Sequence, residues 1–187
     1  MCISCSKLQV GESGRKWNFS STFTTVFGHR VFMTQLIGEY QCKLDAKGRV
    51  SIPTGLKRQV PTEAKETFVV NRGFEKCLTL YPKNEWDKET ERINGLNQYR
   101  KEVRLFIRHF FRGATEMTLD GSSRLNLPNG LLSYAGIDKE IVLFAHTNKV
   151  EIWDKATYDA MLDSDADDFA DLAESVMGNL TDNESSN

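Results

Sequence analysis

The sequence predicts an α+β fold made of two tandem β units related by a pseudo-twofold axis, with accessory helices. The main observation is a motif that occurs twice, 75 residues apart, at residues 44–53 and 119–128. Strand-like runs follow each copy in the same order, and one amphipathic helix lies between the copies. A duplicated unit indicates two copies of one local structure, so the same surface would be offered twice to a partner.

The two copies share five positions at one spacing. In each copy an Asp and an Arg are separated by three residues, and a Pro follows the Arg. The shared pairs are Leu44/Leu119, Asp45/Asp120, Arg49/Arg124, Pro53/Pro128 and Leu56/Leu131.

The strands and short helices of the two copies are predicted from alternation and turn residues. In the first copy, strands at 39–44 and 50–52 flank a turn at 46–48 and form a hairpin-like unit, which Pro53 stops. A helical turn at 54–60, strands at 67–71 and 77–81, and a helix opened by Pro82 follow. The second copy repeats this order with a helix at 129–135, strands at 140–145 and 149–153, and a closing helix with Asp154 as its N-cap.

The most regular helix is predicted between the copies, at residues 98–112. Its apolar residues form one face that we expect to pack on a core, namely Val103, Phe106, Ile107, Phe110 and Phe111. A basic ridge runs beside this face and consists of Arg100, Arg104, Arg108 and Arg112. A solvated helix flank, a phosphate contact and a salt-bridged subunit interface are all compatible with the ridge.

Five segments are predicted along the chain. They are an N-terminal extension at 1–32, a first β unit at 33–86, connecting helices at 87–112, a second β unit at 113–158 and an acidic tail at 159–187. The extension has no sustained periodicity, so we expect little independent structure there. The tail carries nine acidic and no basic residues, whereas residues 33–158 carry 20 basic and 16 acidic residues. A basic body is compatible with nucleic-acid binding, and the acidic tail could shield that body from non-specific DNA.

The chain has no apolar run near the roughly 20 residues that a membrane span requires, and residues 1–10 are too polar for a secretory signal. We therefore expect a cytoplasmic protein with reduced cysteines and no membrane partner.

The Asp and the Arg of each motif flank one tight turn. An Asp that enters a turn accepts hydrogen bonds from backbone N–H groups two or three residues on, and Gly48 can adopt the left-handed conformation that closes the loop. Lys47 and Arg49 would then be displayed on a rigid edge, suited to a phosphate or, for Arg, to a bidentate guanine contact. The alternative is an Asp–Arg pair that only holds a hairpin.

Residues 35–160 resemble the MraZ family. The resemblance lies in Gly38-Glu39-Tyr40, Leu44-Asp45-Ala46-Lys47-Gly48-Arg49, Ile52-Pro53, Cys77-Leu78-Thr79-Leu80-Tyr81-Pro82 and Glu85-Trp86, followed by Leu119-Asp120, Arg124, Pro128 and Glu151-Ile152-Trp153. Either Asp–Arg motif alone would point only to the wider AbrB-like group of swapped-hairpin β-barrels. The resemblance thus implies two AbrB-like swapped-hairpin units that form a pseudo-twofold barrel. It also places Met33 where a start is expected, so we expect residues 1–32 to be a disordered extension or a non-native start.

The resemblance implies a bacterial transcription factor, usually a repressor, that binds repeated sites in double-stranded DNA upstream of the division and cell-wall gene cluster. It also implies a ring-shaped homo-oligomer associated with the nucleoid, in which weak loop pairs engage successive repeats. The family motif carries over to Asp45, Lys47, Arg49, Asp120 and Arg124. We expect Lys47, Arg49 and Arg124 to contact DNA, whereas Asp45, Gly48 and Asp120 structure the loops.

The second copy departs from the family pattern at the residues inside its loop. Ser123 holds the place of the glycine that normally precedes the Arg, the glycine lies at Gly121, and Ser122 corresponds to Lys47. We therefore expect a different turn and a weaker attraction for phosphate in the second loop.

Other candidate sites have weak signals. The acids between Asp163 and Glu174 follow an EF-hand spacing, but Asp168 stands where the loop needs Gly. Cys2 and Cys5 lack a second ligand pair, and Cys42 and Cys77 are expected to fill core space. No catalytic or nucleotide-binding motif is recognisable, so we expect no enzyme, no metal, no cofactor and no small-molecule substrate. The alternative to a DNA-binding protein is an oligomeric scaffold whose Asp–Arg loops are structural.

Overall fold

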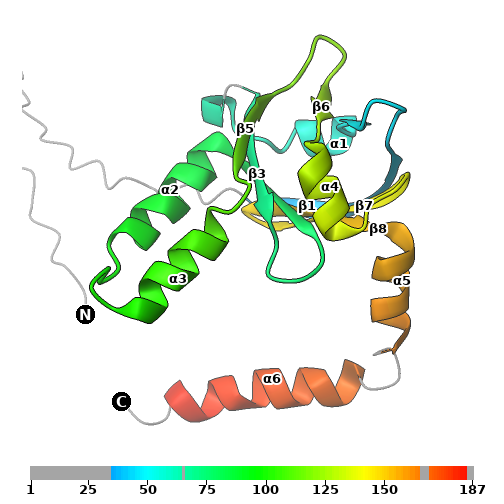
Figure 1. Ribbon diagram of the computed structural model, residues 1–187. Coiled ribbons are helices and arrows are strands. Elements are labelled where there is room, and N and C mark those ends of the chain that lie inside the picture. The colour runs from blue at the N-terminus through cyan, green and yellow to red at the C-terminus, as the bar shows by residue number, and fades with distance from the viewer. Residues whose placement is uncertain (1–34, 65, 165–168, 185–187) are drawn as a thin grey trace, which may run out of the picture. The chain divides into compact units, whose positions relative to one another are not determined.

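The computed structural model describes residues 35–64, 66–164 and 169–184 and shows the predicted α+β architecture (Figure 1). The predicted extension at 1–32 lies outside these residues. The strands are β1 (Leu36–Lys43), β2 (Arg49–Ser51), β3 (Thr67–Arg72), β4 (Leu78–Pro82), β5 (Thr115–Thr118), β6 (Arg124–Asn126), β7 (Glu140–Thr147) and β8 (Lys149–Asp154). The helices are α1 (Thr54–Lys57), the 3₁₀ turn η1 (Thr62–Ala64), α2 (Lys83–Asn94), α3 (Lys101–Phe110), α4 (Asn129–Ala135), α5 (Lys155–Ser164) and α6 (Phe169–Glu184).

Strand pairing interleaves the two copies of the repeat. Strands β1 to β4 come from the first copy and β5 to β8 from the second, and six of them form an antiparallel sheet in the order β1-β7-β8-β4-β3-β5. The first strand of each copy pairs with the third strand of the other, as β1 with β7 and β5 with β3. The copies also meet where β4 pairs with β8 and where β2 pairs with β6 in a separate ladder. Corresponding strands thus have corresponding partners, as a pseudo-twofold relation requires.

The expected closed barrel is not found among the described strands. The large sheet ends at β1 and β5, and the β2–β6 ladder contains only three residue pairs. Pro53 and Pro128 follow this ladder within two residues on either strand and cannot donate a backbone hydrogen bond, so they limit its extension.

The main core lies between the large sheet and the β2–β6 ladder. Alternate residues of the sheet strands face inward, such as Phe68 and Val70 of β3 and Ile141 and Leu143 of β7. They pack with Val50 and Leu125 from the ladder, which are fully buried, and with leucines of α1 and α4. The ladder that carries both motifs is therefore fixed to the core through its inner face.

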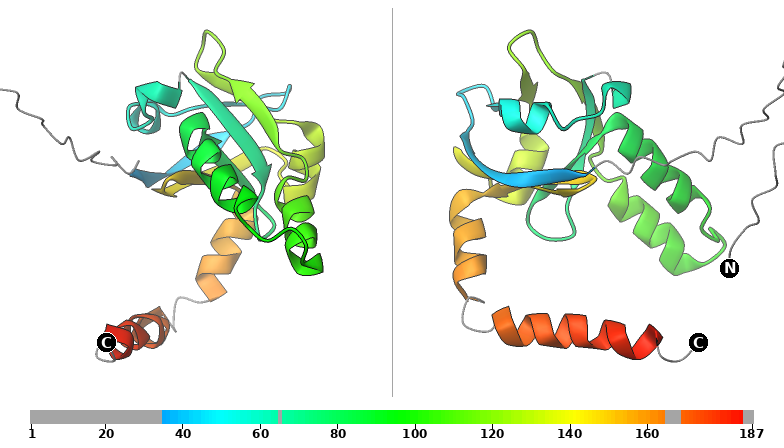
Figure 2. Two further views of the ribbon diagram at one scale, coloured as in Figure 1. Left: turned by 90° about the vertical axis from the view of Figure 1, so that its left-hand side faces the viewer. Right: turned by 180° about the vertical axis from the view of Figure 1, so that it is seen from behind.

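The opposite face of the sheet is covered by helices at two places (Figure 2). Val142 of β7 and Trp153 of β8 pack with Tyr158 of α5. Val69 of β3 and Tyr81 of β4 pack with Trp86 of α2 and with the end of α3. The predicted N-cap of the closing helix is confirmed, because the Thr157 backbone N–H donates to Asp154 Oδ1 at 3.0 Å.

Helix α3 differs from its prediction in two ways. It spans Lys101–Phe110 rather than residues 98–112. Its apolar face was expected to pack on a core and does so only at the C-terminal end, where Phe110 and Phe111 pack against the cluster of Val69, Tyr81 and Trp86, and no residue of the helix is fully buried. Phe110 stacks on Trp86 with ring centroids 5.3 Å apart, but Phe106 remains 37% exposed. The helical periodicity correctly predicted an amphipathic helix but could not show that its apolar face extends beyond the core.

None of the helices in the described part of the chain is long and apolar enough to cross a membrane.

Candidate nucleic-acid interface

The first loop, residues 45–49, is closed by Asp45. Oδ1 of Asp45 accepts the backbone N–H groups of Lys47 at 2.8 Å and Arg49 at 3.1 Å, and Oδ2 accepts Arg49 Nε at 2.7 Å. The same Oδ2 lies 2.6 Å from Nη2 of Arg49, so the guanidinium grips the carboxylate through two nitrogens. Gly48 has a φ of +74°, and its N–H donates to the Asp45 carbonyl at 3.0 Å. One carboxylate thus orders the turn and the Arg together.

The second loop, residues 120–124, has the same geometry, so the expectation of a different turn is wrong. Asp120 Oδ1 accepts the N–H groups of Ser122 at 2.8 Å and Arg124 at 3.0 Å, and Oδ2 lies 2.9 Å from Arg124 Nε. Arg124 Nη2 lies 2.8 Å from the same oxygen. Ser123 adopts a φ of +56°, the left-handed conformation that Gly48 adopts in the first loop.

The environment of each loop explains why one has Gly and the other Ser at this position. A Cβ at Gly48 would lie 3.3 Å from Cδ1 of Leu132 on α4, so a side chain there has little room. Ser123 instead faces α1, where Lys57 Nζ donates to its Oγ at 2.9 Å. A left-handed non-glycine residue costs about 1–2 kcal/mol, and a hydrogen bond to a charged group offsets a cost of this size.

The two loops are tied to each other through the β2–β6 ladder. The Leu127 N–H donates to the Gly48 carbonyl, and the Ile52 N–H donates to the Ser123 carbonyl, each at 3.0 Å. In all three ribbon views the two loops project on the same side of the sheet (Figures 1 and 2). The sequence-predicted residues Lys47, Arg49 and Arg124 are therefore brought to one surface, together with Asp45, Gly48 and Asp120.

Alternation along the ladder places the two arginines on its outer face. Val50 and Leu125 point into the core, so Arg49 and Arg124 lie on the opposite face, where their side chains are 28% and 31% exposed. Ser51 and Asn126 share that face, and sequence reasoning missed both. The period of two around Val50 and Leu125 would have identified them.

We call each Asp–Arg pair, Asp45 with Arg49 and Asp120 with Arg124, a clip. The pKa of the Asp carboxyl is lowered in both clips. The hydrogen bond from Arg49 lowers the pKa of Asp45 to about 2, and the hydrogen bond from Arg124 lowers the pKa of Asp120. Bonding to Asp45 in turn raises the pKa of Arg49. Each guanidinium keeps further N–H donors beyond those that grip the carboxylate, and these can serve another acceptor.

The charges of the two loops are unequal. In each loop the Asp and the Arg cancel, which leaves Lys47 as the excess charge of the first loop and none in the second. Lys57, which the sequence did not single out, lies beside the second loop but pairs with Glu66 at 2.7 Å. The first loop is therefore the more attractive to a phosphate.

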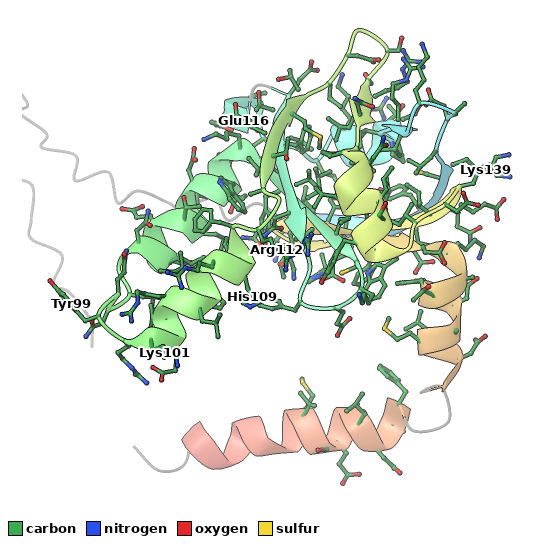
Figure 3. All side chains as sticks on the ribbon, viewed as in Figure 1. Tyr99, Lys101, His109, Arg112, Glu116 and Lys139 are labelled. Atoms are coloured by element: carbon green, nitrogen blue, oxygen red, sulfur yellow. The ribbon has the colours of Figure 1, made fainter. Side chains whose placement is uncertain are left out.

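The basic ridge of α3 is not brought together with these loops. Arg104 donates to the carbonyls of Gln98 at 2.9 Å and Tyr99 at 2.6 Å, so its guanidinium holds the turn before the helix. Arg100 lies 3.8 Å from Glu102, while Arg108 and Arg112 are exposed. Figure 1 shows α3 away from the two loops, and Figure 3 shows His109 and Arg112 at its sheet-proximal end. The ridge belongs to a different surface.

Metal and cysteine sites add nothing to this interface. Among the described residues, no cluster of His, Cys, Asp and Glu could hold a metal ion. Part of the EF-hand-like run, at 165–168, lies outside them, as do Cys2 and Cys5. Cys77 is buried with Trp153, as expected of a core thiol, and burial raises its pKa to about 12.

Comparison with known proteins finds the same internal repeat, because one family model matches the chain twice. A family model described as "MraZ protein, putative antitoxin-like" matches residues 36–109 and again 110–179. The chain is 49% identical over 148 residues to the transcriptional regulator MraZ of Christiangramia forsetii, which covers 79% of this chain and 96% of that protein. The proteins of the same name from Flavobacterium psychrophilum and Cytophaga hutchinsonii are 44% and 40% identical. Their alignments cover 81% and 75% of this chain, and 98% and 93% of the relatives. With two matches of the family model and relatives aligned over nearly their whole length, the chain belongs to the MraZ family.

Proposed function

We propose that this chain is a sequence-specific DNA-binding transcriptional regulator that acts by occupying repeated sites in double-stranded DNA. The observation that carries the proposal is the pair of Asp–Arg loops that one ladder presents on one surface with the same hydrogen bonds. The relatives named transcriptional regulators support it. A non-enzymatic role agrees with these names.

The loops suit DNA because their cations are held in place before binding. The carboxylates of Asp45 and Asp120 fix Arg49 and Arg124, so little side-chain order is lost when the remaining guanidinium donors meet a phosphate or a guanine edge. Lys47 at the tip of the first loop adds a contact without base specificity. The outer face of the ladder would then straddle or enter the major groove.

The proposed targets are the repeats upstream of the bacterial division and cell-wall gene cluster, where binding would repress transcription. Each loop pair carries little net charge, so several must act together for tight binding. We infer a ring-shaped homo-oligomer in the cytoplasm, associated with the nucleoid. The exchange of β1 and β5 between the copies supports AbrB-like swapped-hairpin units as its building blocks.

The test is a binding titration with the upstream DNA of the protein's own gene cluster and a scrambled duplex of equal length. Arg49→Ala should greatly weaken specific binding, and light scattering should show unchanged assembly. Equal affinity of this variant and the wild type at matched salt would refute the assignment of Arg49.

A scaffold without DNA binding is the second candidate, and the exposed face of α3 is the observation that favours it. The dependence of binding on salt concentration distinguishes the two functions. Binding through several phosphates falls steeply with ionic strength, with a slope of about 0.9 per phosphate on logarithmic axes, whereas apolar assembly does not weaken in this way.

A further inference from the structure

A groove beside α3 is lined by aromatic side chains and left open. It is a cavity of about 400 Å³ between α3 and the outer face of β3 and β4. Phe74, Tyr81, Phe106 and Phe110 form its apolar wall, and His109 and Arg112 lie at the same surface (Figure 3). We call these six residues and the space between them the α3 groove. Phe74 is 85% exposed, so most of its ring is available to a partner.

Asn71 and Arg72 also line this cavity, and each has a buried polar atom without a hydrogen-bond partner. Asn71 is 1% exposed, and its Oδ1 has no hydrogen-bond partner, although its Nδ2 donates to the Phe110 carbonyl at 3.1 Å. Nε of Arg72 is buried and unpaired as well. Buried polar atoms are nearly always satisfied by protein or ordered water, so these two atoms are free to bond to water or to a partner that enters the groove.

Helix α6 carries a surface that complements the α3 groove. Phe169, Leu172 and Val176 recur at helical spacing and are 70%, 52% and 57% exposed. The charged side chains of α6 that the structure describes are both acidic, namely Asp171 and Glu174. The charged residues along α3 and at its two ends are mostly basic, namely Arg100, Lys101, Arg104, Arg108 and Arg112, against Glu102 alone.

We propose that α6 of one chain docks into the α3 groove of a second copy. The apolar stripe of α6, formed by Phe169, Leu172 and Val176, would pack on the aromatic wall of the groove. The acidic residues of α6 would lie beside the basic residues of α3, so both the hydrophobic effect and charge favour the same contact. Phe169, Leu172 and Val176 of α6 and Phe74 and Phe106 of the groove are all exposed, and a second copy is an occupant that would cover both surfaces at once. Two different surfaces of each copy are used, so the contact is heterologous and can close into a ring. The inference rests on the proposed oligomer and names its interface.

The test uses two full-length variants that each remove one half of the contact. Leu172→Asp with Val176→Asp breaks the stripe, and Phe74→Asp with Phe106→Asp breaks the groove. Light scattering should show that each variant alone falls below the wild-type mass. An equal mixture should form a one-to-one complex, because an intact stripe then meets an intact groove. Tyr99→Asp, at a site 96% exposed and outside the groove, should keep the wild-type mass.

Either of two results overturns the inference, namely wild-type mass for both double variants or no complex in the mixture. Circular dichroism confirms that the variants are folded, and photo-crosslinking provides a second measurement. A crosslinker at position 172 of an isotopically light chain should label α3 of a heavy chain. Labelling of light chains alone would place the contact within one chain and overturn the proposal.

Failure of this interface can be distinguished from failure of the DNA-binding proposal. Interface variants should lose affinity for DNA with several repeats by at least about 10-fold, because avidity is lost, while affinity for a single repeat stays the same. Unchanged mass with stronger binding to random DNA would instead show α6 acting as a shield for the loops and would overturn the inference. Loss of DNA binding in Arg49→Ala tests the loops alone.

Discussion

The two loops of this protein share one backbone conformation, but they differ in the residue that occupies its left-handed position, Gly48 in the first loop and Ser123 in the second. Both Gly48 and Ser123 adopt the left-handed conformation, but Leu132 leaves little room for a side chain at position 48, whereas Ser123 has room and accepts a hydrogen bond from Lys57. The Asp–Arg clips on either side are alike to within a few tenths of an ångström. The comparison shows that the frame of a binding loop and its charge can vary independently, since only the first loop carries Lys47.

The largest expected effect follows from the shared frame. Arg49→Ala and Arg124→Ala each remove a proposed DNA contact and leave a surface carboxylate without its partner, so each should weaken binding to the repeats by about 100-fold. Because the clips are alike, the two losses should agree within about threefold, an equality that rests on their shared geometry. Fluorescence anisotropy at fixed salt measures both. A loss confined to Arg49→Ala would show that the second loop does not touch DNA.

The next effect separates the environments of the two left-handed residues. Gly48→Ser should lower the free energy of unfolding by about 1–3 kcal/mol, because the new side chain is strained and meets Leu132. Ser123→Gly should stay within about 1 kcal/mol of wild type, since strain and one hydrogen bond are lost together. Denaturant unfolding of both variants measures the difference. Equal destabilisation would contradict the account of the neighbouring helices.

The unequal charge of the loops predicts a pair of opposite changes in affinity. Lys47→Ser copies the second loop into the first and should weaken binding by about 10-fold, and Ser122→Lys should strengthen it by a similar factor. Both side chains are exposed, and only their backbone N–H groups bond to the Asp, so the fold should not change. The salt dependence should become shallower in the first variant and steeper in the second.

The smallest effect is a pH dependence of the two clips. The pKa of Asp45 is lowered to about 2 by its hydrogen bond from Arg49, so the clip stabilises the native state above the ordinary Asp pKa of about 3.9. That contribution should be lost as the pH falls from about 4 to about 2. Carboxyl NMR should find a midpoint near 2 for Asp45 and a lowered midpoint for Asp120. Ordinary midpoints for both would mean that the clips are open in solution.

Much of the fold could be predicted from the periodicity of apolar residues and from the positions of turn residues and prolines. The helix at Asn129–Ala135, the strands around the two motifs and the cap at Asp154 were all found, because turn residues and prolines act locally. The pairing of β1 with β7 and of β5 with β3 could not be predicted, since it depends on contacts far apart in sequence. The open face of α3 was missed for a related reason, as periodicity shows which residues share a face but not what covers it.

The residues of the candidate site could be predicted from the sequence, but the equal geometry of its two loops could not. The spacing of Asp45 and Arg49 gave the clip, and the repeat gave the second loop. Ser123 suggested a different turn because the sequence does not show that Lys57, 66 residues away, reaches its hydroxyl. A local rule for left-handed residues was thus overridden by a tertiary contact.

We propose that both loops face the same DNA with equal backbone geometry and that only the first loop adds a positive charge, Lys47. Moving this lysine to the second loop tests the proposal most directly. The double variant Lys47→Ser with Ser122→Lys keeps the net charge and both clips but transfers the lysine to the second loop. Titration against the upstream repeats should show near wild-type affinity and salt dependence, well above Lys47→Ser alone. Affinity as low as that of the single variant would contradict the claim, because it would mean that only the first loop faces the DNA.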